Sequence, residues 1–377
     1  MLRKISVLIC LTQAALFLSA QEDSVVVRKL SLLFIGDIMG HDEQIASAWN
    51  SETRNYEYDD VFRYVRDEIS EADIAVANLE VTLGGPPYKG YPAFSSPASL
   101  TSACMNAGID VLATANNHSV DRGKKGILNT IRRLDSLGIR HTGTFADSIA
   151  MDTLSPMTIE RNGITIALLN YTYGTNGLKV PSPTIVNMLD TSLIASDIAK
   201  AKTLKPDVII PFVHWGIEYD TLPSKEQTRL ATWFFNKGAH IVIGSHPHVL
   251  QKMEWTAADS CRNDRIVIYS LGNYISNQRT IRRDGGAMVR IELEKTDSLT
   301  KVNRAGYYLT WVHTPVEDGK RKFYVLPCSE FENKPEHFNR PSDYQKMKLF
   351  IRNSRNLLNS GNSGIKEIIH SGEGWIY

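Results

Sequence analysis

The sequence predicts an α/β protein, and three observations support this. Short apolar runs typical of buried strands alternate with amphipathic stretches typical of helices through most of the chain. Toward the C-terminal third, apolar and polar residues alternate one by one, which indicates antiparallel strands and therefore a mixed sheet or a second sheet. Polar residues directly follow several of the apolar runs, and open α/β sheets bind ligands at the carboxyl ends of their strands.

Strands are predicted where a short apolar run ends in glycine or in polar residues. Leu30–Ile38 is the first such run, and Ile241–Ile243 is bounded by glycines. The other buried strands are predicted at Ile74–Ala77, Ile109–Ala115, Ile164–Leu169, Val208–Val213 and Ile266–Ser270. The alternating stretches, predicted to be antiparallel strands, are Met288–Leu293, Tyr307–His313 and Phe323–Leu326.

Helices are predicted where apolar residues recur every three or four positions. Lys124–Leu137 carries its apolar residues on one face, and Gly138 follows as a stop signal. Ser224 begins a capping-box pattern that opens a helix closed by Gly238. The other predicted helices are Tyr58–Ile69, Ser99–Ala107, Thr191–Thr203 and Ser342–Leu358, and the chain after the last of these is expected to be loosely held.

Composition and charge exclude some classes of function. The chain has 377 residues, of which 42% are hydrophobic and 22% charged, as in ordinary globular proteins. A net charge of +1 gives no general attraction for nucleic acid, so no nucleic-acid partner is expected. Cys104, Cys261 and Cys328 are too few for a disulfide framework, although one bridge is possible.

The first twenty residues, Met1–Ala20, are predicted to be a cleaved export signal. Basic residues precede an apolar run from Ile5 to Leu18, and small residues precede Gln21. Cys10 lies inside this run after a bulky residue, which argues against a lipid-modified protein. An uncleaved anchor is the alternative, but the run is shorter than the ~20 residues of a spanning helix. We therefore expect a periplasmic, secreted or envelope-associated protein.

Polar side chains stand directly after five predicted strands, where they would share one rim of a sheet. Taken singly, they have ordinary alternatives: Asp37 and Asn117 suit turns, Glu80 suits a helix cap, and His214 suits a hydrogen-bonded core histidine. Together they favour a cation, because buried ionisable groups at one rim carry a desolvation cost that a cation offsets. The set is Asp37, Glu80, Asn117 with His118, His214, and His246 with His248.

The His-Pro-His motif after the Ile241–Ile243 strand is the centre of this set. On a turn, His246 and His248 can converge on one point instead of pointing to opposite faces. Gly244 lets the chain bend, and Pro247 fixes φ between the histidines. A chance pair of surface histidines is the alternative interpretation of this motif alone.

The donor types indicate which metals would suit the site. Two carboxylates, an amide oxygen and three imidazoles suit zinc, manganese or iron better than calcium. The number of donors exceeds what one tetrahedral ion needs. Two ions sharing a carboxylate, at the ~3.5–4 Å separation of two-metal hydrolytic sites, would use them all.

Six motifs occur in a fixed order between about Lys29 and Asn277. They are Gly36-Asp37-Ile38-Met39, Asn78-Leu79-Glu80, the stretches 116–123 and 214–219, the stretch 244–251, and 269–274. In this order they resemble the CapA (PgsA-type) capsule and poly-γ-glutamate synthesis proteins. That family in turn resembles the calcineurin-like metallophosphoesterases, which implies a four-layer α/β/β/α sandwich of two mixed sheets flanked by helices. We expect this domain to span residues 21–330, followed by a helical extension over 331–377.

The resemblance implies a divalent metal centre with one or two ions. His118 would be the general acid, and Asp121, three residues later, is close enough in sequence to orient or charge its imidazole. The implied ligands are Asp37 and His248 for the first metal, Glu80 for the bridge, and Asn117, His214 and His246 for the second metal.

Two positions depart from the phosphoesterase pattern. Met39 stands where those enzymes have a histidine, and a thioether cannot replace an imidazole for a hard or borderline ion. Glu80 stands where they have an aspartate. His41 could substitute for the missing imidazole, with a hydrogen-bonding loop histidine as the alternative.

Three functions are compatible with these features. The first is an exported CapA-type component that handles poly-γ-glutamate or another polyanionic capsule polymer by metal-dependent hydrolysis or transfer, with membrane-bound synthesis partners. The second is a metallophosphoesterase acting on an exported phosphate ester, and the third is a non-catalytic binding or assembly factor. Residues that could line a groove for a polyanion are Arg122, Lys124, Lys125, Tyr171, Tyr173, Trp215 and Tyr219, whereas Arg132 and Arg133 suit a solvated helix face.

Overall fold

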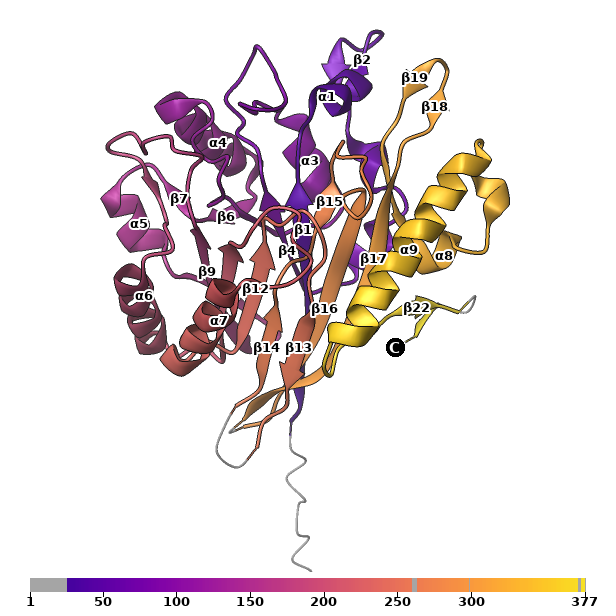
Figure 1. The fold of residues 1–377 in the computed structure, drawn as a ribbon. Coiled ribbons are helices and arrows are strands. Elements are labelled where there is room, and N and C mark those ends of the chain that lie inside the picture. Colours follow the sequence, from indigo (N-terminus) through magenta and orange to yellow (C-terminus); the bar gives the residue numbers. More distant parts are fainter. Residues whose placement is uncertain (1–25, 260–262, 298, 372–373, 377) are drawn as a thin grey trace, which may run out of the picture.

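The computed structural model describes residues 26–259, 263–297, 299–371 and 374–376. Two large sheets lie face to face, and helices cover the outer face of each (Figure 1). This is the predicted four-layer arrangement of two mixed sheets flanked by helices. The expected export signal Met1–Ala20 and Cys261 lie outside the described residues, while Cys104 and Cys328 are free and buried.

The first sheet combines parallel and antiparallel strands around β1 (Arg28–Ile38). β1 pairs in parallel with β4 (Ile74–Leu79) and in antiparallel with β16 (Gly285–Lys295), so that Leu30 faces Leu293 across the ladder. The strands predicted to be antiparallel therefore extend this sheet. In spatial order the path is β20 (Tyr324–Pro327), β17 (Thr300–His313), β16 (Gly285–Lys295), β1, β4 (Ile74–Leu79), β5 (Val111–Ala113) and β6 (Arg140–Thr142), with β15 (Asn273–Ile275) on β1 and β21 (Lys366–Glu367) on β17.

The second sheet is parallel at its centre and antiparallel at both edges. Its buried strands are continuous apolar runs, as expected for a sheet covered on both faces. The spatial order is β13 (Met253–Thr256), β14 (Arg265–Ile268), β12 (Ile241–Ser245), β11 (Val208–His214), β9 (Ile164–Thr172) and β8 (Met157–Arg161).

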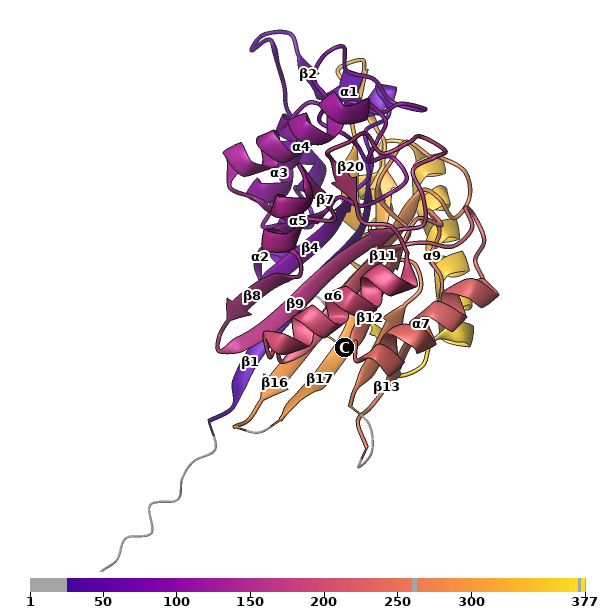
Figure 2. The same ribbon diagram turned by 90° about the vertical axis from the view of Figure 1, so that its left-hand side faces the viewer.

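Three apolar layers hold the sandwich together. Between the sheets, the rings of Phe34 and Phe212 meet edge to face at 6.4 Å. Outside the first sheet lie a 3₁₀ turn (Asp59–Phe62), α2 (Arg66–Ser70), α3 (Ser99–Asn106) and, toward the β6 edge, α4 (Gly123–Leu137). Outside the second sheet lie α6 (Thr191–Thr203) and α7 (Lys225–Lys237), as Figure 2 shows.

The helix-boundary signals are confirmed at three positions. Ser224 forms the predicted capping box at the start of α7, and Gly238 ends that helix at φ 107°. Gly138 ends α4 at φ 71°, a left-handed conformation that favours glycine.

The single helix predicted over Tyr58–Ile69 is wrong. Val65 adopts φ −130° and ψ 4°, which interrupts the helix between the 3₁₀ turn and α2. Phe62, Val65 and Ile69 are nevertheless fully buried against the first sheet. The apolar spacing therefore predicted correctly which residues are buried. A 3₁₀ turn and a short helix, instead of one continuous helix, place them against the sheet.

The chain after Leu358 is also more ordered than predicted. Helix α9 (Pro341–Gly361) packs Met347 and Phe350 into the core between the sheets. Ile365 and Ile368 are buried in turn, because β21 adds to the edge of β17. Tertiary contacts thus order a segment whose own sequence carries little signal.

No helix within the described ranges combines the length and apolar character needed to cross a membrane.

Several short helices and strands were not predicted from the apolar pattern. The short elements are α1 (Asp42–Ala48), α5 (Ser148–Leu154), α8 (Cys328–Phe331), a 3₁₀ turn (Pro335–His337), β2 (Trp49–Asn50), β3 (Asn55–Tyr56), β7 (Thr144–Phe145), β10 (Ile185–Val186), β18 (Val316–Glu317), β19 (Lys320–Arg321), β22 (Ile369–His370) and β23 (Trp375–Ile376).

Candidate metal centre

The residues predicted as ligands meet where the carboxyl ends of both sheets come together. The first sheet supplies Asp37 from β1, Glu80 after β4 and Asn117 after β5. The second sheet supplies His214 from the end of β11, and His246 and His248 from the turn after β12. All six are nearly or completely buried. The predicted ligands were expected at the rim of one sheet, but both large sheets contribute residues to this rim.

Asp37 and His248 form one half of the cluster. His248 Nδ1 lies 3.1 Å from Asp37 Oδ2 and 3.1 Å from Asn273 Oδ1. The Asn78 amide donates to Asp37 Oδ1 at 2.8 Å. These contacts fix the carboxylate and one ring nitrogen, and they leave His248 Nε2 on the side of Glu80, 3.7 Å from Oε1.

His214 forms the other half. Its Nε2 lies 2.8 Å from Asn117 Oδ1 and 3.5 Å from Glu80 Oε1. Its Nδ1 lies 2.9 Å from the Ser245 hydroxyl, which fixes the ring orientation. The second sheet thus presents an imidazole nitrogen to two oxygen donors of the first sheet.

Glu80 lies between these halves without a conventional partner. Neither of its carboxylate oxygens accepts a hydrogen bond from a described residue, and the buried Nδ1 of His246 also lacks one. Two donors bound tetrahedrally to one ion at about 2.1 Å lie about 3.4 Å apart, close to the 3.5 and 3.7 Å separations from Glu80 to the histidines. Ligand atoms of Glu80, His246 and His248, and of Asp37, Glu80 and His214, lie within 4.8 Å of one another. The donor set therefore fits a divalent cation.

The charges in the cluster are strongly coupled. Burial and the Glu80 charge raise the pKa of Asp37 above its ordinary value. Burial would also raise the pKa of Glu80, but His248 and His214 hold it well below the usual range. Burial and His214 lower the pKa of His246 to about 2, so this ring is neutral and able to act as a ligand at pH 7. Such buried charges are costly without a compensating cation.

His118 and Asp121 form a separate pair beside the cluster. His118 Nδ1 lies 2.8 Å from Asp121 Oδ2, and both side chains are nearly buried. The same carboxylate oxygen accepts the Phe94 backbone N–H at 2.7 Å, and the Phe94 ring meets the His118 ring edge to face at 4.7 Å. The spacing of three residues therefore does place Asp121 where it can orient the imidazole. A histidine held in this way is suited to proton transfer.

The turn between His246 and His248 differs from the predicted one. His246 adopts φ 100° and His248 φ 58°, conformations rare for residues with a side chain. Gly244 lies within β12, where an added Cβ would approach Tyr269 O to 2.1 Å. Gly244 thus permits close packing, and the histidines themselves make the bend. Uncommon backbone conformations of this kind gather at functional sites.

The departures from the phosphoesterase pattern have clear locations. Met39 is buried in the apolar layer between the first sheet and its helices. His41 precedes α1, with Nδ1 3.0 Å from Gln44 Oε1, and accepts the Asn277 backbone N–H at 3.2 Å. The His41 side chain thus contacts α1 and the segment after β15, in agreement with the alternative role of a hydrogen-bonding loop histidine.

Several residues near the cluster were not predicted, and the tyrosines divide into two groups. Asn78 and Asn273 hold Asp37 and His248, and although both lie in motifs that carry the family resemblance, no role was predicted for them. Tyr171 and Trp215 are buried core residues. Tyr173 and Tyr219 are partly exposed, with ring centroids 4.5 Å from His246 and 6.1 Å from His248. Lys124, Lys125, Arg132 and Arg133 are exposed on α4, and Arg122 is half-buried just before it.

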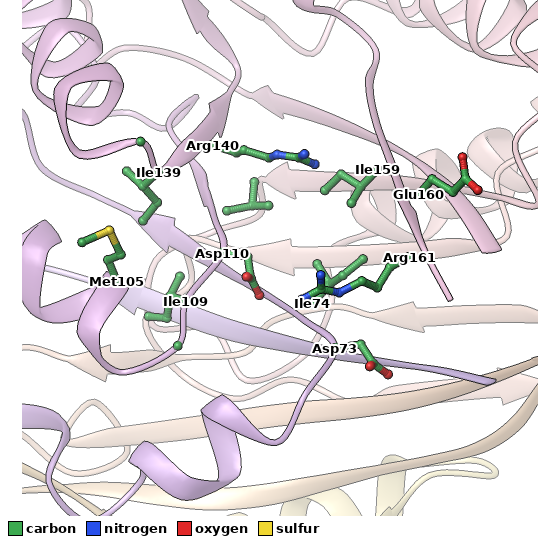
Figure 3. Close-up of a pocket in the computed structure, with 13 residues that line it drawn as sticks. Asp73, Ile74, Met105, Ile109, Asp110, Ile139, Arg140, Ile159, Glu160 and Arg161 are labelled. Atoms are coloured by element: carbon green, nitrogen blue, oxygen red, sulfur yellow. The ribbon is translucent and has the colours of Figure 1, made fainter. Parts of the chain in front are cut away.

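One cavity lies on another part of the molecule. Its volume is about 310 Å³, and it opens at the amino ends of β4, β5 and β6, away from the cluster. Figure 3 shows Asp110, Arg140 and Arg161 around an apolar floor. None of the predicted ligands lines this cavity.

Comparison with known proteins assigns the family. The bacterial capsule synthesis protein family PGA_cap matches residues 31–278, which include every predicted site residue. This chain belongs to the PGA_cap family. The CapA resemblance predicted from six motifs is thereby confirmed.

Two relatives are named for capsule or PGA biosynthesis. The capsule biosynthesis protein CapA of Bacillus anthracis is 29% identical over 278 residues, covering 70% of this chain and 64% of its own length. The PGA biosynthesis protein CapA of Bacillus subtilis strain 168 is 29% identical over 278 residues, covering 71% of this chain and 68% of its own. The chain therefore spans less than two thirds of the first relative.

A solved structure shares the fold. The NAD nucleotidase NadN of Haemophilus influenzae superposes with a TM-score of 0.50 and 11% identity, covering 88% of this chain and 68% of that one. At this identity the likeness concerns the fold alone. It agrees with the metallophosphoesterase-like sandwich that the motifs imply.

Proposed function

We propose that this PGA_cap protein is an exported component of capsule or poly-γ-glutamate synthesis that carries a metal-dependent hydrolase-type site. The observation that carries this proposal is Glu80, a buried carboxylate without a hydrogen-bond donor among the described residues, placed between histidines of the second sheet. Family membership supports the capsule role.

The residues divide into binding and proton-transfer roles. By the phosphoesterase resemblance, Asp37, Glu80 and His248 would hold one divalent ion, and Glu80, Asn117, His214 and His246 a second. The atoms that lie within 4.8 Å of one another group differently, Glu80 with His246 and His248, and Asp37 and Glu80 with His214. The chemistry that a bound divalent ion supplies is Lewis-acid polarisation of the bond to be cleaved. His118, oriented by Asp121, would donate a proton to the leaving group.

The substrate proposed is a polyanionic polymer such as poly-γ-glutamate or another capsule component, handled together with membrane-bound synthesis proteins. The name of the Bacillus subtilis relative supports the polymer, and the predicted export signal supports the envelope as the place of action. A phosphate ester is the second candidate substrate, because the His118–Asp121 pair supplies the acid that the phosphoesterase resemblance requires.

Elemental analysis of the purified protein tests the metal centre. We expect one or two equivalents of manganese, zinc or iron in the wild type, and loss of metal in Glu80→Ala. His141→Asn is the matched control, because this histidine pairs with Asp135 away from the site and its removal should leave metal content unchanged. A wild-type protein that stays metal-free after incubation with these ions would instead indicate a binding or assembly factor.

A further inference from the structure

An arginine stands beside the candidate metal centre without a carboxylate partner. The Arg283 guanidinium lies 3.3 Å from the centroid of the Tyr219 ring, and that ring lies 6.1 Å from the ring of His248. Within the described ranges, no carboxylate oxygen comes within 4.0 Å of the Arg283 side-chain nitrogens. A stacked guanidinium keeps the N–H donors at its edge available for an anion.

The backbone of Arg283 is held by Asn273, which also contacts the predicted ligand His248. Asn273 Oδ1 lies 3.1 Å from His248 Nδ1, and the same Asn273 side chain donates to the Arg283 carbonyl at 2.7 Å. One amide therefore joins a predicted ligand to the backbone that carries the cation. The contacts therefore link His248 to Asn273, Asn273 to Arg283, Arg283 to Tyr219, and Tyr219 back to His248.

The loop between β15 and β16 is anchored at a second point. The largely buried Arg279 guanidinium lies 5.4 Å from the Trp311 ring centroid, and the Trp311 indole donates to Asp284 at 2.8 Å. Arg283 therefore lies on a loop held on both sides. A cation fixed in this way loses little conformational entropy when an anion binds.

The partly exposed tyrosines add surface to this position. Tyr219 is 39% exposed, and Tyr173, against His246, is 45% exposed. An anion arriving over His248 would meet the Arg283 guanidinium that is stacked on the Tyr219 ring.

We propose that Arg283 and Tyr219 form an anion-binding subsite next to the metal centre, which takes an anionic oxygen group of the substrate. This deepens the proposed function and rests on it. The group is the free α-carboxylate of a residue if the substrate is a γ-linked glutamate polymer, and a phosphate if it is a phosphate ester. Both have oxygens that a guanidinium binds in bidentate fashion. Arg283 follows the matched segment 31–278, so the family assignment does not include it.

The test compares Arg283→Gln with Arg282→Gln, which removes the same charge from the exposed neighbouring residue. Metal-loaded proteins are titrated with a γ-linked glutamate decamer, with its methyl ester and with inorganic phosphate, and metal content and thermal unfolding are recorded for each variant. We expect Arg283→Gln to weaken binding of the anion by about tenfold or more, as for a lost charge-assisted hydrogen bond. Arg282→Gln should change it less than threefold, and Arg283→Lys should restore part of the loss.

The outcomes separate this inference from the proposed function. Decamer binding that Arg283→Gln leaves unchanged overturns the subsite but keeps the polymer substrate. Phosphate binding that depends on Arg283, without decamer binding, supports the subsite and overturns the polymer. An equal loss of anion affinity in Arg283→Gln and Arg282→Gln would show a general charge effect and overturn the subsite. A wild-type protein that binds neither anion would also overturn it. Binding of the methyl ester as tight as that of the decamer also overturns it.

Discussion

His214, on the second sheet, lies 2.8 Å from the Asn117 side chain on the first, between His214 Nε2 and Asn117 Oδ1. Both are buried, so this contact joins the two sheets through polar atoms at their carboxyl edges. Both are also predicted ligands of the same metal. The site is therefore complete only when the two sheets are docked.

His214→Ala and His246→Ala should each abolish metal retention at the second site while the protein remains folded. Their strands are held by apolar neighbours that these changes leave in place. For His214→Ala, we expect the metal-free protein to lose about 1–3 kcal/mol of unfolding free energy, because Ser245 and Asn117 lose a buried partner. Metal content and thermal unfolding should be measured together. Retained metal with lost stability would identify structural histidines.

His118→Ala should leave metal content and stability nearly unchanged and lower any hydrolytic turnover by about 10²–10⁴-fold, the usual effect of a lost general acid. Asp121→Asn should have a smaller effect, because the amide keeps one oxygen for the ring and for the Phe94 N–H. Turnover and metal content of each variant provide the check. Loss of metal in His118→Ala would make this residue a ligand, and an undiminished turnover would place proton donation elsewhere.

Metal affinity should rise with pH because of His248. Burial lowers the pKa of this ring, but Glu80 and Asp37 raise it to about 9, above the ordinary 6.5. The protonated ring stabilises the metal-free fold fully below pH 6.5, and this contribution is lost as the pH rises through 9. Since a metal must displace that proton, the dissociation constant should fall by up to about tenfold per pH unit between pH 6.5 and 8.5.

Competition with a chelating dye at several pH values measures this dependence. Asp37→Asn is the informative comparison, because loss of the carboxylate charge lowers the pKa of His248 and should flatten the profile even though affinity falls. A wild-type affinity that does not change over this pH range would show that His248 releases no proton on binding.

Export predicts the mass of the mature chain. Cleavage after Ala20 would give a protein that begins at Gln21, because a signal peptidase requires small residues before the cut. Intact-mass analysis of periplasmic or secreted material checks this. A mass that includes Met1–Ala20, or lipid on Cys10, would contradict the prediction.

Local pattern in the sequence predicted the α/β class and the members of the cluster, whereas the four-layer sandwich was implied by the family resemblance. Apolar runs place the strands, and a polar residue directly after a strand must lie at the carboxyl edge. The positive φ angles of His246 and His248 were not predictable, since they result from packing of the turn against the sheets. Asn78 and Asn273 were missed because an asparagine at a strand end usually indicates only a turn. The split at Val65 likewise depends on tertiary contacts.

The pairing of Leu30 with Leu293 also determines the order in which the molecule can assemble. Strand β1 is the first described element, yet one of its neighbours, β16, follows every strand of the second sheet along the chain. The loop that this ladder closes contains the whole second sheet, and contacts so distant in sequence form slowly. We therefore expect the β1–β16 ladder to form late in folding. Refolding should then be slow, and the chain should be prone to aggregate until the ladder has formed.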